Sequence, residues 1–203
     1  MVSAPISKEE FILPYPPDVV ATKFRATWLA SSLRAARTRG FFDRYLANLP
    51  KEYHDVVLHS VAGEWLPVEV ALAHYAALDA LALSEVEILA IGAEVNARFN
   101  NIFLQTVLRL AKGVGATPWT AFRQAQKMWD RTWVGGGYAI VKLGEREARG
   151  EVVGWPCARF RYTRVGMRGM VSGTTSLFCR RAWVQEIPAQ CTDTRLVYKI
   201  NWV

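Results

Sequence analysis

The sequence contains few of the residues from which disulfide frameworks and metal centres are built. Its 203 residues include three cysteines, which are Cys157, Cys179 and Cys191, and three histidines, which are His54, His59 and His74. An odd number of cysteines without a C-x-x-C spacing argues against a disulfide framework and fits a reducing compartment. We therefore expect a cytoplasmic protein.

Zinc is the metal that these residue types would suit best. The three cysteines and Glu186 are four ligands of the right kind, but they are widely spaced. A free cysteine is commonly a small buried apolar residue, and His54 and His59 lack the i, i+4 spacing of a helical ligand pair. Zinc is therefore disfavoured.

Long apolar runs and catalytic signatures are also missing. No apolar run reaches about 18 residues, and the first 20 residues contain three acids and four prolines in place of a basic start and an apolar stretch. We expect no membrane span. The sequence has no G-x-S-x-G, H-E-x-x-H or P-loop motif, so it gives no direct sign of an enzyme.

Basic residues exceed acidic ones, giving a net charge of +7. This excess permits binding to nucleic acid or to another acidic partner, but it does not require it. The basic residues gather in residues 23–44 and 159–199 and not in a tail. A scaffold module with a basic surface is therefore one alternative function.

The pattern of apolar residues changes once along the chain. Residues 1–17 form an extended lead-in that ends in a proline-rich stretch, and helical periodicity then runs over about 18–133. After three glycines at 135–137, the chain reads as short alternating strands over about 137–203. The order predicts one α+β domain over 18–203, with N-terminal helices packed on a C-terminal antiparallel sheet.

The stretch WPCARFRYTRVGMRGM, residues 155–170, is rich in arginine and aromatic residues. Read as a strand over 159–165, it places Phe160, Tyr162 and Arg164 on one face. A surface for single-stranded nucleic acid would carry aromatic and basic side chains together, and here the alternation separates most of them. Nucleic acid is therefore disfavoured, and whether Arg164 enters a pocket or lies in water stays open.

Eight tryptophans make an aromatic seam between helices and sheet the best candidate for a ligand pocket. Trp129 and Trp133 lie one helical turn apart just before the glycines. Other residues whose predicted helix or strand position turns them toward this seam are further candidates for the pocket wall. The predicted pocket residues are His74, Tyr75, Trp129, Trp133, Phe160, Tyr162, Arg164 and Tyr198.

The order of elements and two sequence stretches together suggest a family. Helices, a glycine-marked change to a meander and a terminal Y-x-I-x-W strand at 198–202 resemble a small α+β ligand-binding superfamily. It includes the 4-vinyl reductase domains, the haem–nitric oxide binding domains and the TRAPP subunits. The lead-in and residues 99–133 further resemble a family of uncharacterised proteins abundant in myxobacteria. The resemblance implies a pocket between helices and sheet, and frequent homodimers.

The functional motifs of that superfamily match this chain poorly. The haem clamp Tyr-x-Ser-x-Arg would begin at Tyr162, but Arg164 stands in the place of Ser and Gly166 in the place of Arg. The zinc pattern Glu-x-x-Cys is also broken, because Glu186 and Cys191 are five residues apart. We therefore expect no cofactor, with both haem and zinc disfavoured.

These observations favour a non-catalytic sensor or carrier domain that binds a small apolar or aromatic molecule. The alternative enzyme would be an isomerase or cyclase acting on an apolar substrate, with Asp79, His74 or Tyr162 moving the proton. Nothing in the sequence shows that these three residues converge, so the prediction leans away from catalysis.

Overall fold

A five-stranded antiparallel sheet with strand order β1-β5-β6-β8-β7 is the centre of the fold. The computed structural model describes residues 10–97 and 117–203. The strands are β1 (Glu10–Leu13), β5 (Gly137–Gly144), β6 (Glu147–Val153), β7 (Ala182–Glu186) and β8 (Leu196–Trp202). Four of the five follow the glycines at 135–137, where the sequence predicted the change from helix to strand.

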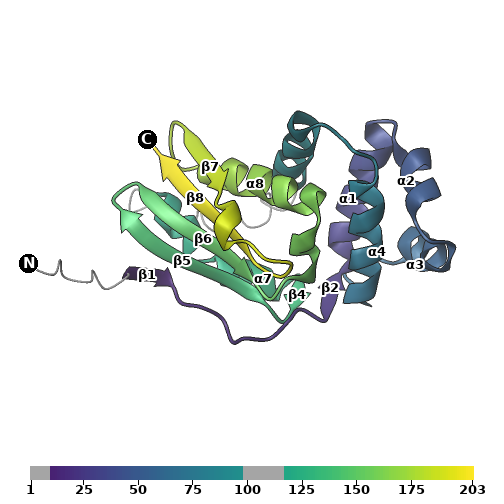
Figure 1. Cartoon of the computed structure of the whole chain (residues 1–203), viewed down its shortest axis with the longest axis horizontal. Coiled ribbons are helices and arrows are strands. Elements are labelled where there is room, and N and C mark those ends of the chain that lie inside the picture. Colours follow the sequence, from purple (N-terminus) through teal and green to yellow (C-terminus); the bar gives the residue numbers. More distant parts are fainter. Residues whose placement is uncertain (1–9, 98–116) are drawn as a thin grey trace, which may run out of the picture.

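Helices cover one side of this sheet in two layers (Figure 1). In the view of Figure 1, α8 lies between the sheet and the more distant α1 and α4. The helices are α1 (Ala26–Thr38), α2 (Phe42–Asn48), α3 (His54–His59), α4 (Val68–Asp79), α6 (Pro118–Phe122), α7 (Ala125–Asp130) and α8 (Arg161–Thr175), together with helical residues 85–97 and short 3-10 turns at Lys51–Tyr53, Pro156–Arg159 and Pro188–Gln190. The α+β class, with N-terminal helices packed against a C-terminal sheet, is confirmed.

A second, three-stranded sheet ties the helical part to the large sheet. It pairs β2 (Lys23–Arg25) with β3 (Trp65–Pro67) on one side and with β4 (Trp133–Val134) on the other. The helical region predicted from about residue 18 therefore begins only at Ala26, because the backbone before it is paired as a strand. Trp133 likewise lies on β4 and not on a helix.

The prediction of a strand over 159–165 is wrong, because α8 begins at Arg161. Three glycines and several β-branched residues in 161–175 favour strand over helix by local propensity. Burial decides otherwise: one side of α8 packs on β7 and another on α4. The buried positions of α8 are therefore more frequent than those of a helix with one buried face. They alternate along part of the helix, as the buried positions of a strand would.

The lead-in and the residues directly after it contact the large sheet and the glycine turn that precedes β5. β1 pairs with β5, and Val19 accepts a hydrogen bond from the backbone N–H of Gly136. Gly135 and Gly136 both have positive φ, and a Cβ on Gly135 would lie 2.5 Å from the carbonyl oxygen of Val20. The glycines are required here by both the turn and the close passage of the lead-in.

Two further expectations from the sequence concern the extent of the helices and a membrane span. Within the helical region predicted over about 18–133, residues 98–116 lie outside the described residues. No helix among residues 10–97 and 117–203 is long and apolar enough to cross a membrane.

Candidate functional site

An apolar cavity of about 120 Å³ lies between the sheet and helices α6, α7 and α8. The sheet contributes side chains from the face of β5, β6 and β8 that is turned toward the helices. The described lining residues are Trp28, Asn96, Ala121, Phe122, Ala125, Met128, Trp129, Thr132, Tyr138, Ile140, Gly150, Val152, Met167, Met170, Val171, Thr174, Tyr198 and Ile200.

The polar side chains of this cavity already have partners in the protein. The Tyr198 hydroxyl donates to the carbonyl of Arg164 at 2.7 Å, and the Tyr138 hydroxyl donates to the sulfur of Met167 at 3.3 Å. Thr174 donates to Asn96 at 2.9 Å. The wall therefore presents mainly carbon and thioether atoms to an occupant.

A tryptophan cluster supports one side of the cavity. Trp129 stacks on Trp133 with ring centroids 5.5 Å apart, and Trp155 meets both rings edge-on. The indole N–H of Trp129 donates to the carbonyl of Gly135 at 2.8 Å. Stacked and edge-on rings of this kind hold each other in place, so the cavity wall is preorganised.

A smaller cavity of about 30 Å³ adjoins the first one along α8. Three residues, Trp28, Met167 and Met170, line both cavities. The smaller cavity is further lined by Ser32, Tyr75, Ile91, Gly92, Val95, Trp155, Tyr162, Thr163 and Gly166.

Five of the predicted pocket residues lie at or directly behind these cavities. Trp129 and Tyr198 line the larger cavity, and Tyr75 and Tyr162 line the smaller one. Trp133 packs behind Trp129. These residues come from α4, α7, β4, α8 and β8, which only the tertiary structure brings together.

His74 lies apart from both cavities. It is completely buried on α4, and its Nδ1 contacts the Tyr45 hydroxyl at 2.7 Å. Burial lowers the pKa of the imidazole to about 3, so His74 is neutral at any pH at which the protein would work.

Arg164 and Phe160 also lie outside the cavity walls. Arg164 is neither in a pocket nor in open water, because it forms an ion pair with Glu186 from β7, and a hydrogen bond to that carboxylate raises its pKa. Phe160 precedes the first turn of α8 and is only half-buried. Arg168, from the same helix, pairs with Glu85.

The groups suggested for proton transfer have structural partners instead. An Asp79 carboxylate oxygen accepts the backbone N–H of Tyr162 at 2.6 Å and so caps the start of α8. The Tyr162 hydroxyl is buried, and burial raises its pKa. Burial thus moves the pKa of both His74 and Tyr162 away from the near-neutral range that suits a general acid or base.

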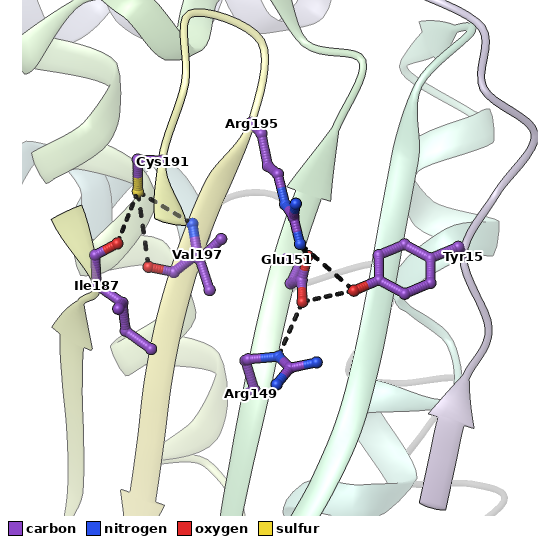
Figure 2. A network of polar contacts seen from close by, with 7 residues as sticks. All are labelled: Tyr15, Arg149, Glu151, Ile187, Cys191, Arg195 and Val197. Atoms are coloured by element: carbon purple, nitrogen blue, oxygen red, sulfur yellow. Dashed lines mark hydrogen bonds and ion pairs between the residues drawn. The ribbon is translucent and has the colours of Figure 1, made fainter. Parts of the chain in front are cut away.

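The cysteines do not form a metal centre. Within the described ranges, no group of three or more His, Cys, Asp or Glu side chains could hold a metal ion. Cys157 is buried, whereas the Cys191 thiol contacts the backbone of Ile187 and Val197 (Figure 2).

Sequence reasoning missed most of the cavity wall. Met128, Met167 and Met170 are absent from the predicted pocket because their positions follow from α7 and α8, and α8 was read as a strand. Gly150 and Val152 alternate with Arg149 along β6, and that alternation is the signal that would have identified their shared face.

The opposite face of β6 carries a polar network (Figure 2). Glu151 is fully buried and accepts hydrogen bonds from Arg149 at 2.9 Å, from Arg195 at 2.9 Å and from the Tyr15 hydroxyl at 2.7 Å. The network attaches the lead-in to the sheet on the side away from the cavities.

Comparison with solved structures identifies the fold. An H-NOX protein from K. algicida, in a mutant form, matches with a TM-score of 0.67 over 88% of this chain and 96% of its own, at 9% identity. The chain folds like an H-NOX domain. An oxygen-binding H-NOX domain related to soluble guanylate cyclases matches with a TM-score of 0.57 at 12% identity, over 88% of this chain and 94% of that one. No family model and no curated protein matches the sequence.

These neighbours support the haem–nitric oxide binding part of the resemblance, and they correct the cofactor prediction. One matched structure, with a TM-score of 0.58 at 13% identity over 88% of this chain and 99% of its own, concerns haem redox potential and porphyrin distortion. This match overturns the prediction of no cofactor, with haem disfavoured, because a matched protein of the same fold holds a haem. The mismatches of Arg164 and Gly166 to the Tyr-x-Ser-x-Arg motif did not bar the chain from this fold.

The described walls of the cavity nevertheless lack a histidine ligand for haem iron and basic partners for the haem carboxylates. Haem iron takes an axial ligand such as histidine, cysteine, methionine or tyrosine, and its carboxylates call for basic partners. The described lining residues include three methionines and two tyrosines but no histidine, cysteine, lysine or arginine. The cavity is also smaller than the roughly 300–1,000 Å³ of sites for drug-sized ligands. The described residues thus fit an apolar ring but not a histidine-ligated haem.

Proposed function

We propose that this chain is a non-catalytic ligand-binding domain of the sensor type, and that its ligand is a small apolar or aromatic molecule bound between α6, α7, α8 and the sheet. The observation that carries the proposal is the preorganised apolar cavity of about 120 Å³. An engineered apolar cavity of about 150 Å³ in another protein stays dry and binds benzene. A single aromatic ring therefore suits a cavity of this volume.

The titratable groups of the wall favour binding over catalysis. Among the described lining residues, the titratable side chains are tyrosines, and burial raises the pKa of both Tyr138 and Tyr198. Their hydroxyls also have partners already. A proton-transferring enzyme would need a group whose pKa lies near the working pH.

Native mass spectrometry of the purified protein tests the proposal, combined with an absorbance spectrum and a screen of tryptophan fluorescence against small aromatic molecules. We expect an apolar molecule to co-purify or to bind with a change in the emission of Trp129. A haem absorbance band would instead identify haem as the occupant, and binding of no molecule would contradict the proposal.

A cavity-filling variant locates the site. Ala125 lies on α7 and lines the cavity, so Ala125→Phe places a ring where the ligand would lie and should abolish binding. Lys127→Phe adds the same ring at an exposed position of the same helix and should leave binding unchanged. Equal binding by both variants would place the site elsewhere.

A further inference from the structure

Every methionine that the structure describes lines the larger cavity. The chain has four methionines, and Met1 lies outside the described residues. The others are Met128 on α7 and Met167 and Met170 on α8, and all of them line this cavity. Methionine is unbranched, rotates about several bonds and adapts to irregular space. The helix side of the cavity therefore has an adaptable wall.

The sheet side of the cavity is fixed by comparison. Its side chains stand on β5, β6 and β8, which are neighbouring strands of the large sheet. The β-branched residues among them, Ile140, Val152 and Ile200, have few accessible rotamers. The hydroxyls of Tyr138 and Tyr198 are hydrogen-bonded. A ligand larger than the cavity must therefore displace side chains of the helices.

Met170 has unfilled volume on a second side, because it also lines the smaller cavity of about 30 Å³. Gly166, Met170 and Thr174 follow one another at i+4 spacing on α8. Gly166 lines the smaller cavity and Thr174 the larger one, so Met170 lies between the two. Met167 is held by the hydrogen bond from Tyr138, which leaves Met170 the freer of the two methionines on α8.

We infer that the site admits apolar aromatic molecules of two fused rings as well as of one, because Met170 shifts toward the smaller cavity and so enlarges the larger one. This inference rests on the proposed function and adds the size class of the ligand. Flexible methionine-rich walls repack around different ligands in promiscuous binding proteins. The alternative is that Met170 fills the core permanently, so that the cavity keeps its volume of about 120 Å³ and excludes a second ring.

Toluene and naphthalene test the size limit. Calorimetric titration gives the dissociation constant of each ligand, with the protein added to the ligand because naphthalene is sparingly soluble. For the wild-type chain, we expect naphthalene to bind at least as tightly as toluene, since the second ring buries more apolar surface.

Gly166→Ala fills part of the smaller cavity and leaves the larger one unchanged. The atom nearest to an added Cβ is a carbon of Ile88 at 3.8 Å, so the variant should fold. With less room beside Met170, the dissociation constant of naphthalene should rise about fivefold or more relative to that of toluene, as overpacking by one methyl group does.

Gly144→Ala is the matched control. Gly144 lines neither cavity, and its added Cβ would lie at an ordinary contact distance of 3.7 Å from Glu147. This variant should keep the wild-type ratio. Because each ratio compares two ligands on the same protein, a general change of stability cancels.

Met170→Ala links the effect to Met170. This variant opens the space that the second ring needs, so no side chain has to move toward the smaller cavity. Adding Gly166→Ala to it should then leave the ratio unchanged. Thermal unfolding shows that each variant is folded.

The outcomes are distinct. Three results would overturn the inference and leave the proposed function standing: a wild-type chain that binds toluene but not naphthalene, an unchanged ratio in Gly166→Ala, or an equal change in Gly144→Ala. An effect of Gly166→Ala that persists beside Met170→Ala would exclude Met170 as the moving side chain. If neither ligand binds the wild-type chain, the proposed function fails and this inference fails with it.

Discussion

At the scale of single residues, Glu151 shows how a charge is kept inside this fold. Its carboxylate is fully buried between the guanidinium groups of Arg149 and Arg195, with the Tyr15 hydroxyl as a further donor (Figure 2). Glu151→Gln would leave two arginines without their anion. We expect the free energy of unfolding to fall by about 3 kcal/mol, the lower end for a broken buried pair because Arg195 is partly exposed. Urea denaturation measures it.

Glu147→Gln is the control for that prediction. Glu147 lies on the same strand, but its partner Lys199 is 44% exposed at the side chain. A surface ion pair of this kind contributes at most about 1 kcal/mol. Equal losses in the two variants would contradict the structural role given to Glu151.

His74 predicts a pH dependence of stability. The folded protein holds it neutral because burial lowers its pKa to about 3, whereas in the unfolded chain its pKa is about 6.5. Below pH 6.5 the unfolded state binds the extra proton, so this contribution to stability is complete above pH 6.5 and is lost as the pH falls toward 3. The loss amounts to about 2 kcal/mol by pH 5.

His74→Gln should remove this component, so that its free energy of unfolding falls by about 2 kcal/mol less than that of the wild type between pH 7 and pH 5. His59 is exposed, and His59→Gln is the matched histidine substitution for comparison. Denaturant titrations at both pH values give the comparison. A wild-type slope in His74→Gln would show that His74 is not the responsible group.

At the scale of elements, glycines set how closely α8 approaches the helix at residues 85–97. A Cβ on Gly169 would lie 2.5 Å from the backbone oxygen of Leu89, and backbone cannot move aside as a side chain can. Gly169→Ala should therefore separate the two helices and cost about 1–3 kcal/mol of stability, as overpacking does. Thermal or urea unfolding checks this prediction.

Gly166 provides the opposite case on the same helix. The atom nearest to a Cβ at Gly166 is a side-chain carbon of Ile88 at 3.8 Å, an ordinary contact. Gly166→Ala should therefore stabilise the protein by about 0.5–1 kcal/mol through helix propensity. Destabilisation of similar size in both variants would show that the helices do not pack as described.

At the scale of the whole molecule, a ligand between helices and sheet should stabilise both layers together. At about 100 times its dissociation constant, a bound ligand adds about 2.7 kcal/mol to the free energy of unfolding, which corresponds to roughly 5–10 °C in Tm for a chain of this size. A small aromatic molecule that binds in the cavity should produce this shift in the wild type. A shift of the same size in Ala125→Phe would contradict binding in the cavity.

Homodimer formation stays a prediction at this scale, and so does the absence of nucleic-acid binding. Sedimentation analysis tests the first. For the second, titration with DNA and RNA over a range of salt concentrations should show no salt-dependent affinity; a steep dependence would indicate contacts with phosphates.

Local sequence patterns predicted the elements that are buried on one face only. Tyr198, Ile200 and Trp202 face the core from β8 with the period of two expected for a strand, and β5 begins at Gly137, as the glycine run predicted. The prediction failed for α8 because this helix is buried on more than one side. Its sequence therefore shows neither a single apolar stripe of helical period nor a high helix propensity. The error carried over to the site, where Met167 and Met170 were missed.

The sequence by itself determined the α+β class, the order of helices and sheet, and the aromatic character of the seam, because period and composition are local properties. Only the tertiary structure decided that α8 is a helix, that Arg164 pairs with Glu186, and that Met167 and Met170 line the cavity. Those outcomes depend on contacts between residues far apart in the chain, where burial free energy outweighs local propensity.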